Sequence, residues 1–351
     1  MKALMKIDSG NGNIELKETP IPIPVKDEVL IKIDTAGVCG TDVHIWYDRF
    51  PNTPPFVLGH EFSGTIEQIG PEIERFKKGD RVVSANNPFA CGKCDICNAG
   101  NPNLCPEKKA MGIHSDGCFA DYIKLPSQLI HVIPDNVSFE QAALMEPLAV
   151  AIHSVANRCR INKNDKVIVF GVGAIGLLAA QVARAEGAAE VLLVGTDRDE
   201  KTRFGCANKL GFKTLNIEKE NLAYEVMSST SGRGVDIVVE ASGSLSAINQ
   251  GLNLLKRTGR MAISGITGKP NISVNWDGLI SKGVTLYFCY GSVNADWEKG
   301  LKYLAEKKVF TMPLITHRFE LAQWQDAFRA LENMEAIRPV FKIGNAKNEE
   351  R

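Results

Sequence analysis

A glycine-rich run, GVGAIG at residues 171–176, leaves the second half of this chain few possible folds. It follows the apolar strand-like segment KVIVFG (166–171) and opens the helix-like stretch IGLLAAQVARAEG (175–187). A strand, a G-x-G-x-x-G loop and a helix in this order are typical of a dinucleotide-binding βαβ unit, in which the helix amides face the pyrophosphate. We therefore expect a nicotinamide dinucleotide to contact Gly171, Gly173, Ala174, Ile175 and Gly176.

The segments that follow this loop alternate between strand and helix patterns. Predicted strands are VLLVG (191–195), DIVVEAS (236–242), RMAISGI (260–266) and VTLYFCYG (284–291), with helix-like stretches between them, one of them over 199–211. This alternation predicts a parallel sheet covered on both faces. Two more helices and a last strand, RPVFKI, come before a polar tail (345–351) that we expect to be frayed.

The first 150 residues have a different pattern. Short β-type runs with period 2, such as VLIKIDTAGV and FSGTIEQIG, are separated by turn residues, and Pro20, Pro22 and Pro24 oppose an early helix. This pattern favours a partly antiparallel β domain. Because the chain has 351 residues, more than a single core usually supports, two domains are expected.

Composition excludes several classes of protein. The formal net charge is zero and no basic stretch flanks the cysteine cluster described next, so a nucleic-acid module is disfavoured. No apolar run is long enough to span a bilayer, and the N-terminal segment lacks the apolar core of a signal peptide. The expected compartment is the cytoplasm, where the nine cysteines are thiols or metal ligands rather than disulfides.

Four of the cysteines form one candidate metal site. Cys91, Cys94, Cys97 and Cys105 lie within fifteen residues, in a segment rich in glycine and proline. Four thiolates at this spacing can enclose a tetrahedral Zn²⁺ with no open position, as in structural sites. An iron–sulfur cluster uses the same ligands and stays an alternative.

A second candidate site is dispersed along the chain. Cys39 and His60 supply one soft and one borderline ligand for zinc, and a catalytic zinc also needs an open position. Further ligands must come from elsewhere. Glu146 is a candidate because it is a lone carboxylate in the apolar run AALMEPLAVA, where an unpaired charge is costly. An exposed acid at a helix start is the alternative for Glu146.

Taken in order, several segments resemble the zinc-containing medium-chain alcohol/polyol dehydrogenase family, and sorbitol-type enzymes most of all. The matching segments are GVCGTDVHIW, LGHEFSGTIEQIG, GDRVV, the four-cysteine lobe, GCFADYIKLP, MEPLAVAIHSV and GVGAIG. The resemblance implies an α/β protein: a GroES-like catalytic domain (1–153), a Rossmann domain with a doubly wound parallel sheet (154–291), and a return segment (292–351) completing the first domain. It also implies a homotetramer or dimer that pairs around VTLYFCYG.

The same resemblance implies roles for individual residues. Cys39 and His60 would ligate a catalytic zinc, with Glu61 and Glu146 ligating it directly or through water. The alcohol-dehydrogenase branch has a cysteine where Glu146 stands, which favours polyols over simple alcohols. Thr41 and His44 would relay the substrate proton by way of the cofactor ribose, and Arg338 would reach the cofactor phosphates.

The activity implied is zinc-dependent hydride transfer between a secondary alcohol and NAD(P). NAD and NADP both stay open, with NAD favoured, because the predicted second strand ends in Gly195 and Thr196 rather than in the usual acid. Asp197, two residues late, could still bind the ribose, or the small pair could admit a 2′-phosphate beside Arg198. One rival is an L-threonine 3-dehydrogenase, which shares the CGTDVHI segment. Another is a non-catalytic or zinc-free cofactor-binding relative, which would lack the zinc ligands.

Overall fold

The computed structural model describes residues 1–344, so the expected frayed tail (345–351) lies outside the described residues. The chain divides into two compact units, and each is described by itself. The first unit comprises Met1–Glu146, Ser292–Ala305 and the chain from Leu314 onward. The second unit comprises Pro147–Gly291 and Glu306–Pro313.

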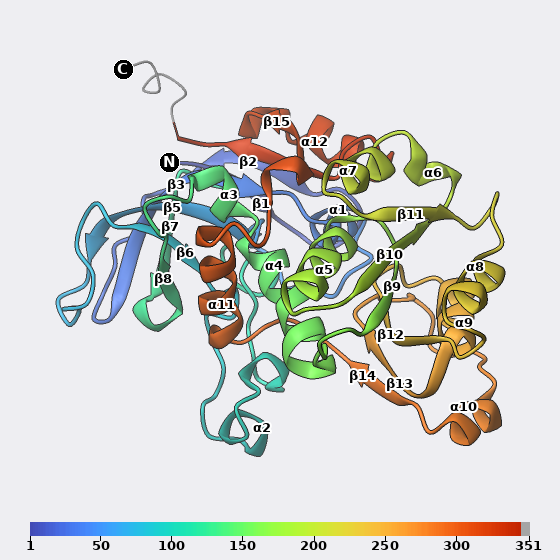
Figure 1. The fold of residues 1–351 in the computed structure, drawn as a ribbon. Helices are drawn as coiled ribbons and strands as arrows, with labels where there is room; N and C mark the ends of the chain where they lie inside the picture. The colour runs from blue at the N-terminus through green and yellow to red at the C-terminus, as the bar shows by residue number, and fades with distance from the viewer. Residues whose placement is uncertain (345–351) are drawn as a thin grey trace. The chain divides into compact units, whose positions relative to one another are not determined.

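Two β-sheets build the first unit (Figure 1). The smaller sheet is antiparallel and has the order β2 (Ile14–Glu18), β1 (Lys2–Lys6), β4 (Phe56–Val57). The larger sheet has the order β15 (Ile315–Phe319), β16 (Arg338–Lys342), β3 (Glu28–Gly37), β5 (Glu61–Ile69), β6 (Arg81–Ser84), β8 (Ile130–Val132), with β7 (Tyr122–Pro126) also paired to β3. All of its pairs are antiparallel except β15 with β16, which agrees with the predicted antiparallel domain.

The core of the first unit lies between this sheet and short helices. Val29, Ile31 and Ile33 of β3 are buried, and the ring of Phe328 lies 5.9 Å from Trp46 between centroids. The helices are α1 (Gly40–Trp46), α2 (Asp95–Asn98), α3 (Phe139–Ala143), α11 (Asn294–Ala305) and α12 (Trp324–Glu332), with 3₁₀ turns at Pro102–Leu104, Ser127–Leu129 and Leu321–Gln323. Helix α4 (Met145–Ile152) starts in this unit.

The second unit is a six-stranded sheet in which every pair is parallel, as the alternating pattern predicts. Its order is β11 (Lys213–Asn216), β10 (Glu190–Gly195), β9 (Lys166–Phe170), β12 (Val235–Glu240), β13 (Leu255–Ile263), β14 (Thr285–Phe288). The chain leaves β9 toward β10 and later returns to its other side at β12. The carboxyl end of β9 is therefore the topological switch point where open parallel sheets bind nucleotides.

Helices cover both faces of this sheet (Figure 1). Helix α5 (Ala174–Ala185) contacts β9 and β10, and α9 (Leu245–Leu254) contacts β12 and β13. The other helices are α6 (Asp197–Glu200), α7 (Arg203–Lys209), α8 (Leu222–Ser229) and α10 (Trp276–Lys282), with a π-helical turn at His153–Cys159 and a 3₁₀ turn at Met312–Leu314. Within residues 1–344, every helix is too short or too polar to cross a membrane.

Three local predictions differ from the structure. The helix predicted over 199–211 is two helices in the structure: α6 ends at Glu200, and α7 begins at Arg203. Strand β11 and helix α8 were not predicted, since a four-residue strand, KTLN, carries too little apolar pattern to be found. Strand β13 begins at Leu255, five residues before the predicted start.

Candidate zinc centres and cofactor loop

Two neighbouring strands of the first unit bring Cys39 and His60 together. Strands β3 and β5 pair antiparallel with Gly37 opposite Glu61, so the end of β3 lies beside the start of β5. Cys39 caps helix α1 just after β3, and His60 directly precedes β5. The ligand atoms of Cys39, His60 and Glu61 all lie within 4.8 Å of one another. The structure thus joins three of the four predicted ligands of the catalytic zinc.

Glu61 lies against an arginine from the C-terminal part of the chain. Its carboxylate is completely buried, and its Oε1 is 3.0 Å from Nη1 of Arg338, which also donates to the carbonyl of Val38 at 3.0 Å. A Cβ at Gly37 would lie 2.5 Å from Oε2 of Glu61, so only glycine leaves room for this carboxylate. Burial lowers the pKa of Arg338, but the charges of Glu61 and Cys39 outweigh it and raise that pKa.

His60 faces the carboxylate of Asp42, a residue not predicted from the sequence. Asp42 is completely buried; its Oδ2 accepts the backbone amide of Cys39 at 2.8 Å, and its Oδ1 is 3.6 Å from Nδ1 of His60. A carboxylate behind a ligating imidazole fixes its orientation and raises its basicity. The available signal was position, because Asp42 is the third residue of the helix that Cys39 caps.

Glu146 reaches the same buried region from helix α4, outside the three-residue group. It is 7% exposed, so the alternative of an exposed helix-start acid is wrong. Its Oε1 accepts a hydrogen bond of 2.7 Å from Asn86, another residue that the sequence analysis missed. Burial, followed by the charge of Glu61, raises the pKa of Glu146 to about 7.

The donor set of this pocket suits a divalent cation. A thiol, an imidazole and carboxylates are the ligands that zinc takes in proteins. Among the described residues, Oδ1 of Asp42, Nδ1 of His60 and Oε2 of Glu61 are buried without a hydrogen-bond partner. Burial lowers the pKa of His60, but Asp42 and Cys39 outweigh it and raise that pKa well above its usual value. The pocket therefore favours positive charge.

The two predicted relay residues lie on the helix that Cys39 caps. The hydroxyl of Thr41 is 3.7 Å from Sγ of Cys39, and Thr41 is half-buried. His44 is exposed and stands three residues later, on the same side of α1. A hydroxyl beside the cluster and an imidazole in solvent are thus placed on one short helix.

The four-cysteine lobe forms a second cluster in the first unit. The sulfur atoms of Cys91, Cys94, Cys97 and Cys105 lie within 4.8 Å of one another. The amides of Cys91 and Cys97 point at Sγ of Cys105 and Cys94, each at 3.5 Å. Hydrogen bonds from the backbone at Lys93 and Cys94 lower the pKa of Cys91 to about 7. This arrangement offers four sulfur ligands and no open position.

The three glycines of the loop in the second unit have different structural roles. Gly171 has φ +95°, a conformation that favours glycine, at the turn after β9. A Cβ at Gly176 would lie 1.9 Å from the carbonyl oxygen of Gly171, so helix and turn pack too closely for any side chain. Gly173 caps α5 and has open space where its Cβ would be, which leaves room for a ligand.

The other residues predicted to bind the cofactor lie in two places, and the geometry does not test their contact with it. Thr196, Asp197 and Arg198 lie at the end of β10, where Thr196 caps helix α6. Arg338 lies beside Glu61 in the first unit, and its Nε has no hydrogen-bond partner among the described residues. Its contact with cofactor phosphates stays a prediction.

Comparison with known proteins agrees with this geometry. Residues 25–135 match the family described as "Alcohol dehydrogenase GroES-like domain", and residues 174–306 match "Zinc-binding dehydrogenase". A sorbitol dehydrogenase of Halalkalibacterium halodurans is 38% identical, over 96% of this chain and 98% of that protein. An L-threonine 3-dehydrogenase of Bacillus subtilis is 36% identical, over 95% and 96%.

A solved structure extends the likeness to three dimensions. A zinc-binding dehydrogenase of Sinorhizobium meliloti, bound to NADP, superposes with a TM-score of 0.90 at 28% identity, covering 97% of this chain and 98% of that one. The predicted fold class, a GroES-like domain with a Rossmann domain, is confirmed. The chain belongs to the zinc-containing medium-chain alcohol/polyol dehydrogenase family and is a zinc-dependent, NAD(P)-linked oxidoreductase that transfers a hydride between an alcohol and its ketone.

Proposed function

We propose that this enzyme oxidises one secondary hydroxyl of a polyol, sugar alcohol or cyclitol with NAD(P), and reduces the corresponding ketone in reverse. The observation that carries the proposal is that the ligand atoms of the half-buried Cys39 and the buried His60 and Glu61 lie within 4.8 Å of one another. The sorbitol dehydrogenase relative supports a polyol substrate. The carboxylate of Glu146, where the alcohol-dehydrogenase branch has a cysteine, supports it further.

In this proposal Cys39 and His60 ligate the catalytic zinc, and Glu61 and Glu146 do so directly or through water. Zinc bound there would act as a Lewis acid that lowers the pKa of the substrate hydroxyl. The four cysteines of the lobe would hold a structural zinc, and metal analysis distinguishes it from an iron–sulfur cluster.

Residues of this chain would compensate charge near the zinc and transfer the substrate proton to solvent. Arg338 compensates the buried carboxylate of Glu61, and Asp42 holds the imidazole of His60. Thr41, beside the thiol of Cys39, can accept a proton and donate one at once, as a hydroxyl relay requires. His44 is exposed and can exchange a proton with solvent near neutral pH.

The glycine loop completes the proposed machinery in the second unit. Gly173, Ala174 and Ile175 would present the amino end of α5 to the cofactor pyrophosphate, since the helix amides there have no partner within the helix. Thr196, Asp197 and Arg198 would contact the adenosine ribose from the end of β10.

A second candidate substrate is L-threonine, because a relative at 36% identity carries that activity in its name. A panel of sorbitol, inositol, sugar acids and threonine, each with NAD and NADP, separates the two by the growth of reduced-nicotinamide absorbance. Turnover of threonine without turnover of any polyol would contradict the primary proposal. A zinc-free, non-catalytic relative would instead show no turnover and no bound metal.

We also propose domain boundaries, an oligomeric state and a cellular location. The catalytic domain would span 1–153 with its return at 292–351, and the cofactor domain 154–291. Strand β14 is the edge strand of its sheet; its last residue, Phe288, is 71% exposed, and Tyr290 just beyond it is 46% exposed. We propose that this edge pairs two copies in a homodimer or tetramer. The nine unbridged cysteines support a cytoplasmic location.

A further inference from the structure

The end of strand β10 lacks the acid that usually selects NAD, and the structure gives the reason. Strand β10 ends at Gly195, where a Cβ would lie 2.8 Å from Oδ2 of Asp199 and 2.9 Å from Val172 of the glycine loop. The carboxylate of Asp199 therefore fills the space that a side chain at position 195 would occupy. A larger residue cannot be placed there without moving Asp199.

Asp199 itself is not available to a ribose. It is 6% exposed, and its Oδ2 accepts hydrogen bonds from the amide and hydroxyl of Thr196 at 3.0 and 3.2 Å. Its Oδ1 is 3.0 Å from Nη1 of Arg203. Both oxygens are thus bound within the protein, and the charge of this carboxylate is balanced by a neighbouring guanidinium.

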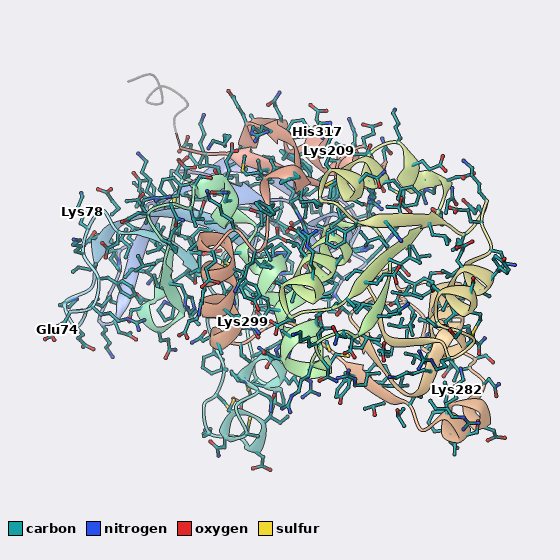
Figure 2. The ribbon with its side chains drawn as sticks, in the orientation of Figure 1. Glu74, Lys78, Lys209, Lys282, Lys299 and His317 are labelled. Atoms are coloured by element: carbon teal, nitrogen blue, oxygen red, sulfur yellow. The ribbon has the colours of Figure 1, made fainter. Side chains whose placement is uncertain are left out.

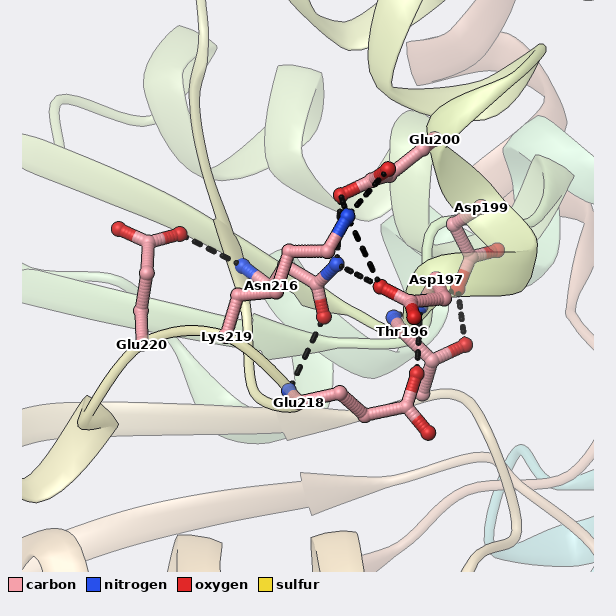
Figure 3. Close-up of polar contacts among 8 residues, drawn as sticks. All are labelled: Thr196, Asp197, Asp199, Glu200, Asn216, Glu218, Lys219 and Glu220. Atoms are coloured by element: carbon pink, nitrogen blue, oxygen red, sulfur yellow. Dashed lines mark hydrogen bonds and ion pairs between the residues drawn. The ribbon is translucent and has the colours of Figure 1, made fainter.

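Asp197, the remaining acid at the strand end, is turned toward the loop after β11 (Figure 3). Its Oδ1 accepts a hydrogen bond of 2.6 Å from Asn216 and lies 3.2 Å from Nζ of Lys219. In NAD-selective sites a carboxylate binds the ribose 2′-hydroxyl, and its charge opposes a 2′-phosphate. Here Lys219 offsets that charge.

The other carboxylates of this corner are also engaged. Glu200 contacts Lys219 and Asn216 at 2.7 and 2.6 Å, and Glu218 accepts the amide of Asp197 at 2.7 Å (Figure 3). Glu220 accepts the amide of Asn216 at 3.0 Å. Each acid beside the strand end therefore has a donor within the protein.

Arg198 differs from its neighbours because its guanidinium has no hydrogen-bond or ion-pair partner among the described residues. It is exposed, follows Asp197 directly, and makes no hydrogen bond or ion pair with another of residues 1–344. Guanidinium groups bind phosphate with paired, charge-assisted hydrogen bonds. The corner thus offers a cation without a partner among the described residues, while each acid there already contacts at least one donor within the protein.

The geometry points to NADP as the preferred cofactor, with Arg198 binding the 2′-phosphate and Lys219 restraining Asp197. This inference rests on the proposed NAD(P)-linked function and names the cofactor that the same site selects. Because binding at this corner involves neither the metal nor the alcohol, it can be measured without substrate.

The test is titration of the full-length protein with NADPH and with NADH, followed by nicotinamide fluorescence in a phosphate-free buffer. We expect the Kd for NADPH to be at least about tenfold lower than that for NADH. In Arg198→Ala, NADPH binding should weaken about tenfold or more, and NADH binding far less. Lys219→Ala should also shift the ratio toward NADH, because it removes a cation from the corner and leaves the charge of Asp197 without its ion-pair partner.

Lys209→Ala is the matched control, since Lys209 is an exposed cation on the following helix α7 (Figure 2) and should leave both affinities unchanged. Equal or tighter binding of NADH by the unaltered protein would overturn the inference while leaving the proposed function intact. Equal weakening of both nucleotides in Arg198→Ala would also overturn it. If neither nucleotide binds, the proposed function fails as well.

Discussion

Glu61 and Arg338 form an ion pair of 3.0 Å that is almost completely buried, although 277 positions separate the two residues in the sequence. The pair joins β5 to β16, two strands that both flank β3. The guanidinium of Arg338 compensates the charge of the Glu61 carboxylate in the cluster that also contains Cys39 and His60. The stability of the pocket therefore depends on an arginine from the last strand.

Replacing Arg338 with Met should destabilise the protein strongly. The change leaves Glu61 buried with its charge uncompensated, so the free energy of unfolding should fall by about 3–5 kcal/mol. Urea unfolding followed by circular dichroism measures this. Arg318→Ala is the control because its pair with Glu140 is partly exposed, at 44% and 19%, and should cost about 1 kcal/mol or less. Equal effects of the two variants would refute this role of Arg338.

Replacing Asp42 with Asn should weaken zinc binding without unfolding helix α1. The amide oxygen can still accept the amide of Cys39, but the negative charge facing His60 is lost. Loss of a group that supports a ligand typically lowers metal affinity about 10–100-fold. Competition with a chelator measures the change. Unchanged zinc affinity would mean that Asp42 serves only as a helix cap.

Alanine at the second and third glycines of the loop, Gly173 and Gly176, should separate packing from cofactor binding. Gly176→Ala places a Cβ 1.9 Å from the oxygen of Gly171, so the folded state should lose about 1–3 kcal/mol. Gly173→Ala meets no atom within 4 Å, so stability should change by about 0.5 kcal/mol or less. Its methyl group would instead stand where the pyrophosphate approaches, weakening nucleotide binding. The opposite pattern in thermal melts and nucleotide titrations would contradict these roles.

His131 should make the first unit sensitive to mild acid. Its ring stacks on Trp297 at 5.9 Å, and burial, followed by the charge of Arg75, lowers its pKa to about 4. The unfolded chain takes up this proton near its ordinary pKa of about 6.5, so stability is complete above that pH and falls between about 6.5 and 4. At pH 5 the loss should be at most about 2 kcal/mol.

His131→Phe keeps the stacked ring and should remove this part of the pH dependence. Urea unfolding at pH 7 and pH 5 measures the difference between variant and wild type. His317→Phe is the matched control, because His317 (Figure 2) also stacks on an aromatic ring, that of Phe319 at 6.1 Å. The prediction fails if His131→Phe loses as much stability at pH 5 as the wild type does.

The sequence predicted local features better than residues that meet through strand pairing. The glycine loop and the four-cysteine lobe are contiguous, so spacing alone indicated their chemistry. Cys39 and His60 were found partly by residue type and partly by resemblance, because the register that places Gly37 opposite Glu61 is a property of the folded sheet. Asn86 was missed since nothing in its own segment shows that it faces Glu146, and Asp42 was missed although its position in the helix that Cys39 caps was a signal.

Short polar strands were also missed by prediction from the sequence. Strand β11 offers four residues, and its last one, Asn216, lies at the corner that holds Asp197. The engagement of Asp197 depends on this strand and on Lys219 beyond it, so the sequence left the choice between NAD and NADP open. Only the contacts of the folded corner show which acids are already bound.

The assignment of Cys39 to a catalytic zinc and of Cys97 to a structural one can be tested by measuring metal content and turnover of Cys39→Ser beside Cys97→Ser. We expect Cys39→Ser to retain about one zinc per chain in the four-cysteine lobe, to bind the nicotinamide cofactor still, and to lose polyol oxidation. Cys97→Ser should lose the lobe zinc and stability instead. A Cys39→Ser protein with full zinc content and near-normal kcat would contradict the assignment of the catalytic centre.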